Sequence, residues 1–262
     1  MLANTVFAPL DTHGASVSRY GIKSRLTDGT RAQVLIAPPG SPSTGRPLLV
    51  FLHGKGGGPE SNLNSELFEE LHALGPQAPD VLLPDGGEDS YWHDRDDGAW
   101  ARYVMSEAIP QAIAKLHADP KRIAIGGISM GGFGAYDIAR LHPGRFCAVG
   151  GHSAAIWESG GESAEGAFDN AEDFARHDLI ARADGNPDAY PGPGGKPSAL
   201  WLDVGTLDPF RRADTRLVEE LRADGRTVSF HVWAGGHESS YWHRHFAAYV
   251  RFYADALASC GN

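Results

Sequence analysis

Residues 122–141, RIAIGGISMGGFGAYDIARL, join an apolar run to a helical pattern across a glycine-rich turn. The run Arg122–Ser129 is typical of a strand buried on both faces of a sheet. The residues from Gly131 to about Leu141 predict a helix. The turn between them carries the pattern Gly-x-Ser-x-Gly centred on Ser129, which is typical of a nucleophile elbow when a strand precedes it and a helix follows it. This junction therefore predicts a reactive serine at the carboxyl end of a strand.

The same alternation of apolar runs and helical patterns extends on both sides of this stretch, and it predicts an α/β fold. Two stretches of β character flank Thr27-Asp28-Gly29, where Asp-Gly predicts an antiparallel hairpin. Because strands that alternate with helices form parallel sheets, we expect a mostly parallel sheet with helices on both faces. One continuous sheet accounts for residues 1–262 as a single domain. The expected hairpin strands are Ser16–Ser24 and Arg31–Pro38; the later strands are Pro47–Gly54, Asp80–Pro84, Cys147–Ser153, Ala199–Gly205 and Val228–Gly235; the other helices are Ser65–Leu74, Trp100–Ala118 with an interruption at Pro110, about Asp208–Ala223 and Ser239–Leu257.

One segment, Ala155 to Pro197, breaks this rhythm after the sixth strand. It is long, rich in small and acidic residues, and ends in a cluster of proline and glycine. Segments of this length inside a compact domain are often functional, so one interpretation is a lid. The alternative is a solvated excursion with one or two small helices.

Composition and charge exclude several classes of protein. The chain has 262 residues, a net charge of −10, and 23 Lys and Arg residues that are scattered rather than clustered. A basic face for nucleic acid is therefore not expected. The longest apolar run, Leu48 to Leu52, is far shorter than the roughly 20 residues that span a bilayer. Membrane spanning is excluded on this ground.

The cysteines and the N-terminal residues bear on the compartment. Cys147 and Cys260 are too few for a disulfide framework, and we expect two reduced thiols. The segment Met1 to Asp11 lacks the basic start and the apolar middle of a secretory signal. Both features predict a cytoplasmic protein.

A serine hydroxyl is a weak nucleophile at neutral pH, so the predicted site needs a base and an orienting acid. Asp208 follows the strand Ala199–Gly205 at the point where a carboxylate would project from its carboxyl end. Asp203 lies inside that strand and Asp214 lies further along, in the next helix, so Asp208 is preferred. Its alternative role is a helix N-cap before Pro209, and we expect that one carboxylate does not easily cap and orient a base together.

The base is predicted at the end of the last strand. His237 follows two glycines there, after the acid and ahead of the final helix. Among the twelve histidines it alone combines these features. A zinc site in the His-rich tail lacks the ligand spacing of tetrahedral sites and support from cysteines.

Two backbone N–H groups are expected to stabilise negative charge on a substrate oxygen. One is the N–H of Met130, which follows the serine at the start of the helix. The other comes from His53-Gly54-Lys55-Gly56-Gly57-Gly58, which is similar to the His-Gly-Gly-Gly segment of lipases and esterases. Lys55 and Gly56 are both candidates for this second donor, and the Lys55 side chain is expected to be solvated.

Aromatic residues after two of the strands are candidates for the substrate pocket. Trp92 follows the strand Asp80–Pro84, and Trp157 follows the strand Cys147–Ser153, both at strand ends where ligands bind in open sheets. Packing is the alternative for each. The run Glu88 to Asp97, EDSYWHDRDD, could be a metal or sugar site, but a solvated loop is preferred. No metal and no cofactor are expected.

Three segments together resemble the esterase D group of α/β-hydrolases, which includes S-formylglutathione hydrolases, feruloyl and siderophore esterases, and mycolyltransferases. These segments are residues 127–135 (GISMGGFGA), 203–210 (DVGTLDPF) and 236–242 (GHESSYW), and the similarity runs from about Val34 to Ala256. The resemblance implies that the second aspartate of Asp-x-Gly-x-x-Asp, Asp208, is the triad acid and that Lys55 supplies an oxyanion N–H. The cysteine-containing segment typical of S-formylglutathione hydrolases is absent, so hydrolysis of glutathione thioesters is not expected.

The sequence thus predicts a serine esterase that acts on small-molecule carboxylic esters through a covalent acyl-enzyme. The catalytic residues would be Ser129, Asp208 and His237. One alternative is an acyltransferase that moves the acyl group to a sugar or another alcohol. A second is a non-catalytic binding protein on the same fold, and a third is a metal-dependent enzyme.

Overall fold

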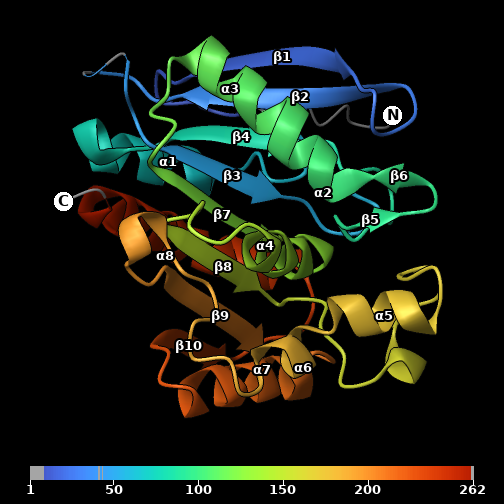
Figure 1. Cartoon of the computed structure of the whole chain (residues 1–262). Helices are drawn as coiled ribbons and strands as arrows, with labels where there is room; N and C mark the ends of the chain where they lie inside the picture. Colours follow the sequence, from blue (N-terminus) through green and yellow to red (C-terminus); the bar gives the residue numbers. More distant parts are fainter. Residues whose placement is uncertain (1–8, 41, 43, 261–262) are drawn as a thin grey trace, which may run out of the picture.

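A computed structural model describes residues 9–40, 42 and 44–260, and it is built around one eight-stranded sheet (Figure 1). Residues 1–8 lie outside the described part of the chain, and with them most of the N-terminal segment that was expected to lack a secretory signal. The strands of the sheet are β1 (Ser16–Lys23), β2 (Thr30–Ala37), β3 (Leu48–Leu52), β4 (Asp80–Pro84), β7 (Ile123–Ile128), β8 (Ala148–His152), β9 (Ala199–Gly205) and β10 (Val228–Trp233).

The strand order confirms the mostly parallel sheet with an antiparallel hairpin at its N-terminal edge. The order is β1-β2-β4-β3-β7-β8-β9-β10. β2 pairs antiparallel with both β1 and β4, and every other pair is parallel. Because the six parallel strands β3, β4, β7, β8, β9 and β10 run in one direction, their carboxyl ends lie along one edge of the sheet, where the predicted site residues are expected to meet.

Helices cover both faces of the sheet, as predicted (Figure 1). On one face, α1 (Ser65–Leu74) packs against α8 (Ser239–Ser259), which also contacts β7, β8 and β9. On the other face, α4 (Met130–Leu141) packs on β7 and β8, and α7 (Arg211–Ala223) packs on β9 and β10. α3 (Ile109–Leu116) covers β2 and β4 on the same face as α4 and α7.

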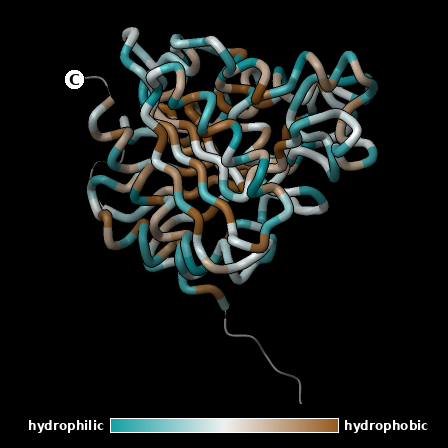
Figure 2. Tube along the Cα trace, turned by 90° about the horizontal axis from the view of Figure 1, so that it is seen from below, coloured by the Kyte–Doolittle hydropathy of each residue, from teal (hydrophilic) through white to brown (hydrophobic). Residues whose placement is uncertain are grey.

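The apolar strands form the centre of the molecule, and Figure 2 shows the hydrophobic segments inside and the hydrophilic ones outside. All five residues of β3 and all six of β7 are buried. Two clusters of buried side chains lie on opposite faces of the sheet, one with α4 and α7 and the other with α1 and α8. Because burial of apolar surface is the main favourable term in folding, these two clusters hold the sheet edge and its loops in place.

The helix expected at 100–118 is divided before Pro110 rather than at it. α2 (Trp100–Tyr103) leads into a π-helical turn, η2 (Val104–Ala108), and then into α3. Proline lacks an N–H and its ring clashes with the carbonyl four residues earlier, so the wider turn accommodates Pro110 without ending the helix. A short hairpin before it, β5 (Asp94–Arg95) and β6 (Gly98–Ala99), had no sequence signal.

The segment 155–197 contains short helices, leaves the sheet at its carboxyl edge after β8 and returns to the opposite edge, where β9 begins (Figure 1). Its elements are η3 (Gly160–Glu162), α5 (Ala171–His177), α6 (Leu179–Ala183) and η4 (Pro193–Gly195). α6 packs against α7. The short helices were expected, but the segment is not simply solvated, because Leu179 and Tyr190 are buried in the core. Movement as a lid stays a prediction.

The expectation of two reduced thiols is wrong. Cys147 and Cys260 form a disulfide with their Cα atoms 5.8 Å apart, within the usual range for disulfides. It joins the residue before β8 to the residue after α8, across a sequence separation of 113. Spacing along the chain did not indicate this pair, because the fold alone brings the end of α8 back to the start of β8.

Candidate active site

Ser129 lies at a sharp turn between β7 and α4, and its backbone is strained. Its dihedral angles are φ 55° and ψ −116°, a region that non-glycine residues rarely adopt. The turn is held by hydrogen bonds from Ser129 N–H to the His152 carbonyl (2.9 Å) and from Ala155 N–H to the Ser129 carbonyl (3.0 Å). A strained residue that its surroundings hold in place is typical of a functional site.

The glycines around Ser129 are required by close backbone contacts. A Cβ atom at Gly131 would lie 2.2 Å from the Leu52 carbonyl oxygen, and one at Gly127 would lie 2.6 Å from the same atom. Real Cβ atoms essentially never approach so closely, so helix α4 can reach β3 only because these positions lack side chains. The glycines of the motif therefore set the position of Ser129 at the sheet edge.

The structure brings the three predicted residues of the site together. His237 Nε2 lies 2.9 Å from Ser129 Oγ, and His237 Nδ1 lies 2.9 Å from Asp208 Oδ2. Asp208 follows β9 and His237 follows β10, so each comes from the carboxyl end of a different strand. The His237 side chain is 26% exposed, whereas the Asp208 side chain is fully buried. Substrate can thus reach the hydroxyl and the imidazole while the carboxylate stays shielded from water.

Asp208 is not the N-cap of α7, and its two oxygens bind different partners. Its Oδ1 accepts a hydrogen bond from Phe210 N–H (2.9 Å), and its Oδ2 binds His237. The first bond closes a turn ahead of α7, whose own N-cap, Phe210, has no side-chain cap. The hydrogen bond from Phe210 N–H to Oδ1 holds the carboxylate in place, so that Oδ2 points toward the imidazole of His237.

The two rival aspartates are buried elsewhere. Asp203 Oδ1 accepts from His152 Nδ1 (2.6 Å) and Trp201 Nε1 (2.8 Å), and its Oδ2 accepts from the hydroxyls of Tyr241 and Tyr249 (2.9 Å each). Both carboxylate oxygens of Asp203 are thus occupied by donors in the interior between the sheet and α8. Asp214 is fully buried on α7, where burial and the nearby charges of Asp208 and Asp203 raise its pKa well above the ordinary value.

Backbone hydrogen bonds distinguish the two candidates for the second oxyanion donor, Lys55 and Gly56. Gly56 N–H donates to the Glu88 carbonyl at 2.7 Å, so it is not free to bind a substrate oxygen, and Gly56 is not supported as the donor. Within the described residues no backbone hydrogen bond engages Lys55 N–H. Met130 is the first residue of α4, where an N–H has no partner inside the helix. Lys55 and Met130 are therefore the two available donors.

The loop that carries Lys55 is fixed by His53, a role that sequence reasoning missed. Gly86 N–H donates to His53 Nε2 (2.9 Å), so His53 Nδ1 carries the proton and donates to the Gly54 carbonyl (2.9 Å). Burial lowers the pKa of His53 and favours this neutral form. The predicted strand Pro47–Gly54 placed His53 near a strand end, but no sequence signal identifies the partner Gly86.

A cavity of about 580 Å³ opens beside Ser129 and His237. Its lining combines polar residues from the loop after β3 with aromatic residues from three other segments, Tyr91, Phe210 and Trp242. Phe210 and Trp242 contact the His237 ring edge to face, with ring centroids 5.0 and 5.1 Å away. Trp242 Nε1 also donates to Ser153 Oγ (3.1 Å), so Trp242 both steadies His237 and lines the cavity.

The two predicted pocket tryptophans do not line this cavity. Trp92 is fully buried, and its Nε1 donates to the His53 carbonyl at 3.1 Å. It therefore supports the loop after β3 from inside the protein and cannot contact substrate. Trp157 lines a smaller neighbouring cavity that shares Pro209 and Phe210 with the first. Both residues do lie after strands as expected, but the pattern could not tell which way each side chain points.

The fold and this arrangement of serine, histidine and aspartate define an α/β-hydrolase of the serine hydrolase class. The chain belongs to the esterase family, whose model, described as "Putative esterase", matches residues 25–253. No curated protein sequence matched the chain.

Several solved structures share the fold. A ferulic acid esterase superimposes with a TM-score of 0.76 at 22% identity, over 92% of this chain and 98% of that one. The S-formylglutathione hydrolase FrmB of Staphylococcus aureus gives 0.71 at 16% identity, over 92% and 99%. MPT51 (FbpC1) of Mycobacterium tuberculosis gives 0.67 at 17% identity, over 96% and 100%. Membership of the esterase family makes this chain a carboxylic ester hydrolase, as the sequence predicted, and the solved structures show that it shares their fold.

Proposed function

We propose that the protein hydrolyses small-molecule carboxylic esters through a covalent acyl-enzyme on Ser129. Neutral His237 Nε2 takes the hydroxyl proton as Ser129 Oγ attacks the ester carbonyl carbon. The N–H groups of Lys55 and Met130 bind the oxyanion that forms, and Asp208 stabilises the imidazolium. His237 then gives its proton to the leaving alcohol, and a water molecule repeats the sequence to release the acid.

The observation that carries this proposal is the continuous chain of contacts from Asp208 through His237 to Ser129, with both distances at 2.9 Å. Hydrogen-bonded nucleophile, base and orienting acid are the signature of an activated serine. A binding protein has no use for a buried carboxylate, an oriented imidazole and two available backbone donors at one point. Ester hydrolysis accounts for all of them together.

Replacement of the nucleophile tests the proposal. Ser129→Ala removes the attacking oxygen while the helix and the glycine contacts remain, so we expect kcat for a p-nitrophenyl ester to fall about 10³-fold or more. Circular dichroism should be unchanged. Turnover of the ester at the wild-type rate in this variant would reject the assignment.

We further propose an oxidising compartment, in place of the cytoplasm expected from two reduced thiols. The disulfide between Cys147 and Cys260 supports this, because structural disulfides persist mainly outside the reducing cytosol. Within the described part of the chain, no helix is long and apolar enough to cross a membrane.

A further inference from the structure

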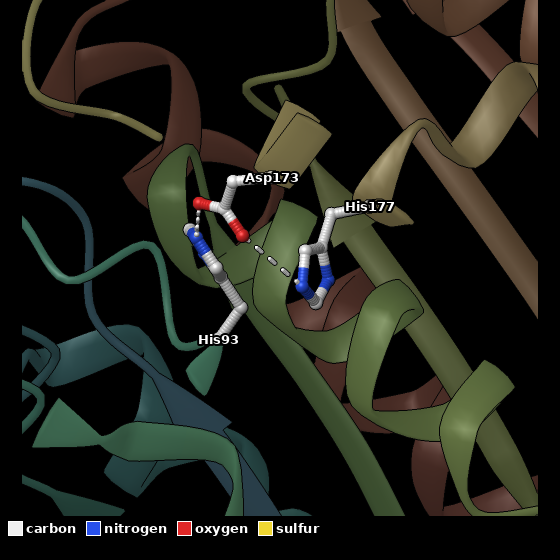
Figure 3. A group of neighbouring side chains, drawn as sticks. All are labelled: His93, Asp173 and His177. Atoms are coloured by element: carbon white, nitrogen blue, oxygen red, sulfur yellow. Dashed lines mark hydrogen bonds and ion pairs between the residues drawn. The ribbon is translucent and has the colours of Figure 1, made fainter. Parts of the chain in front are cut away.

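A buried group of two histidines and one aspartate lies outside the site described above. His93 comes from the loop between β4 and β5, and Asp173 and His177 lie one turn apart on α5 (Figure 3). The side chains of His93 and Asp173 are completely buried, and that of His177 is 9% exposed. Their ligand atoms all lie within 4.8 Å of one another. The three side chains point toward one another in Figure 3.

From this arrangement we propose that His93, Asp173 and His177 bind a zinc ion that fastens α5 to the body of the enzyme. Two imidazole nitrogens and a carboxylate form a donor set that zinc takes in proteins. The group is separate from Ser129 and His237, and the ion has no part in the proposed ester chemistry.

The distances between the donor atoms fit such an ion. His93 Nε2 lies 3.1 Å from Asp173 Oδ2, and His177 Nε2 lies 3.6 Å from Asp173 Oδ1. Ligand atoms at roughly 2.0–2.1 Å from a tetrahedral zinc ion lie about 3.3–3.4 Å from each other. The two observed separations lie on either side of that value but involve different oxygens of Asp173, and the three ligand atoms lie within 4.8 Å of one another, so the side chains must draw closer together to bind one ion.

His177 is oriented as metal-binding histidines usually are. Its Nδ1 lies 2.7 Å from Asp137 Oδ2 on α4, which leaves Nε2 facing the other two residues. A carboxylate that accepts from the far nitrogen fixes the tautomer and strengthens the ligand nitrogen. Asp137 is in turn held by Arg140 Nη2 at 2.5 Å, so its position is set by two partners.

The remaining side-chain partner of Asp173 can give way to an ion. Arg176 also binds Asp173 Oδ1, at 3.0 Å, but its side chain is 59% exposed. An exposed arginine can turn into solvent and release that oxygen to a metal ion.

Zinc binding to the full-length protein tests the proposal. Protein treated with a chelator and then dialysed against Zn²⁺ should hold one ion per chain by mass spectrometric metal analysis, and Co²⁺ in its place should give the visible absorption of a tetrahedral site. His93→Gln and His177→Gln should each lose the ion and the Co²⁺ absorption. His72→Gln, an exposed histidine on α1, is the matched control and should keep both.

Asp173→Asn supplies an independent variant if either glutamine variant fails to fold. It keeps the shape of the side chain but removes its charge, and we expect at least a tenfold loss of zinc affinity. Less than a tenth of an ion per wild-type chain, or equal binding by wild type and the folded variants, would overturn the proposal. Because metal content is measured without any ester, this result is independent of the proposed hydrolase activity.

Discussion

Ser129 keeps a backbone conformation that costs free energy because the turn places its hydroxyl at the sheet edge. Residues held in such a region cost of the order of 1–3 kcal/mol, and they persist where the surrounding structure fixes them. Here the fixing contacts are the hydrogen bonds to His152 and from Ala155, both of which follow or end β8. Hydrogen bonds from the end of the neighbouring strand β8 therefore hold Ser129 in this unfavourable conformation.

At the residue scale, we expect substitution of Asp208 to affect catalysis and substitution of Asp203 to affect stability. Asp208→Asn cannot stabilise the His237 imidazolium and favours the wrong tautomer, so we expect kcat to fall by about 10³–10⁴-fold with little change in melting temperature. Asp203→Asn weakens a buried network of four donors, so melting temperature should fall instead. Ester kinetics and thermal unfolding on both variants provide the comparison. A large loss of kcat in a stable Asp203→Asn protein would contradict the assignment of the acid.

A second prediction concerns Asp80, where burial raises the pKa from 3.8 to about 6. The folded state thus holds this proton more tightly than the unfolded state, and the resulting stabilisation is present at low pH and lost as pH rises through about 6. Asp80→Asn cannot ionise, so it should raise the melting temperature at pH 8, and the gain should vanish near pH 4. Asp28→Asn, in the exposed hairpin loop, makes the same chemical change and is the matched control.

Single residues also mark where sequence reasoning succeeds and fails. Ser129, Asp208 and His237 could be predicted to meet because each directly follows a strand of a parallel sheet. The residues alone left the choice between Lys55 and Gly56 open, since it depends on a hydrogen bond to the Glu88 carbonyl in another loop, and only the family resemblance pointed to Lys55. The prediction that Trp92 lines the pocket was wrong for a similar reason, because its position after a strand does not fix the direction of its side chain.

At the scale of elements, the crossing of β7, α4 and β3 depends on Gly131. Gly131→Ala would place a Cβ atom 2.2 Å from the Leu52 carbonyl oxygen, which is backbone and cannot move aside without shifting β3. We expect the free energy of unfolding to fall by about 3 kcal/mol or more. Gly161→Ala is the matched control, because a Cβ atom there meets nothing within 4 Å. Chemical denaturation measures both, and equal stability of the two variants would refute this account of the motif.

The sequence predicted the helices and strands wherever the apolar pattern was regular. β4, β9 and α1 have the bounds that the sequence predicted, Asp80–Pro84, Ala199–Gly205 and Ser65–Leu74. The π-helical turn and the β5–β6 hairpin were missed because their causes are local: the fit of Pro110 in one case and a two-residue ladder in the other. Neither produces a hydrophobic period.

At the scale of the whole molecule, the disulfide fastens the end of α8 to the sheet. Cys260→Ser should lower the free energy of unfolding by about 2–5 kcal/mol, because the crosslink restricts a long stretch of the unfolded chain. Denaturant titration with and without reductant measures this effect. Reductant should bring the wild type to the stability of the variant and leave the variant unchanged; a wild type insensitive to reductant would contradict the prediction.

Long-range pairing explains why the sequence predicted the layers of the fold but not the disulfide. Alternation of strands and helices reports on neighbours along the chain, and that information was sufficient for a parallel sheet with helices on both faces. Cys147 and Cys260 are separated by several strands and helices, so only the completed fold makes them neighbours.

Covalent labelling of the serine tests the central claim most directly. A fluorophosphonate reacts with a serine only when that hydroxyl is activated by its base, and peptide mass spectrometry locates the adduct. We predict one adduct per chain, on Ser129, formed much more slowly in His237→Ala and absent in Ser129→Ala. An adduct on another residue, or labelling of Ser129 at the wild-type rate without His237, would contradict the account.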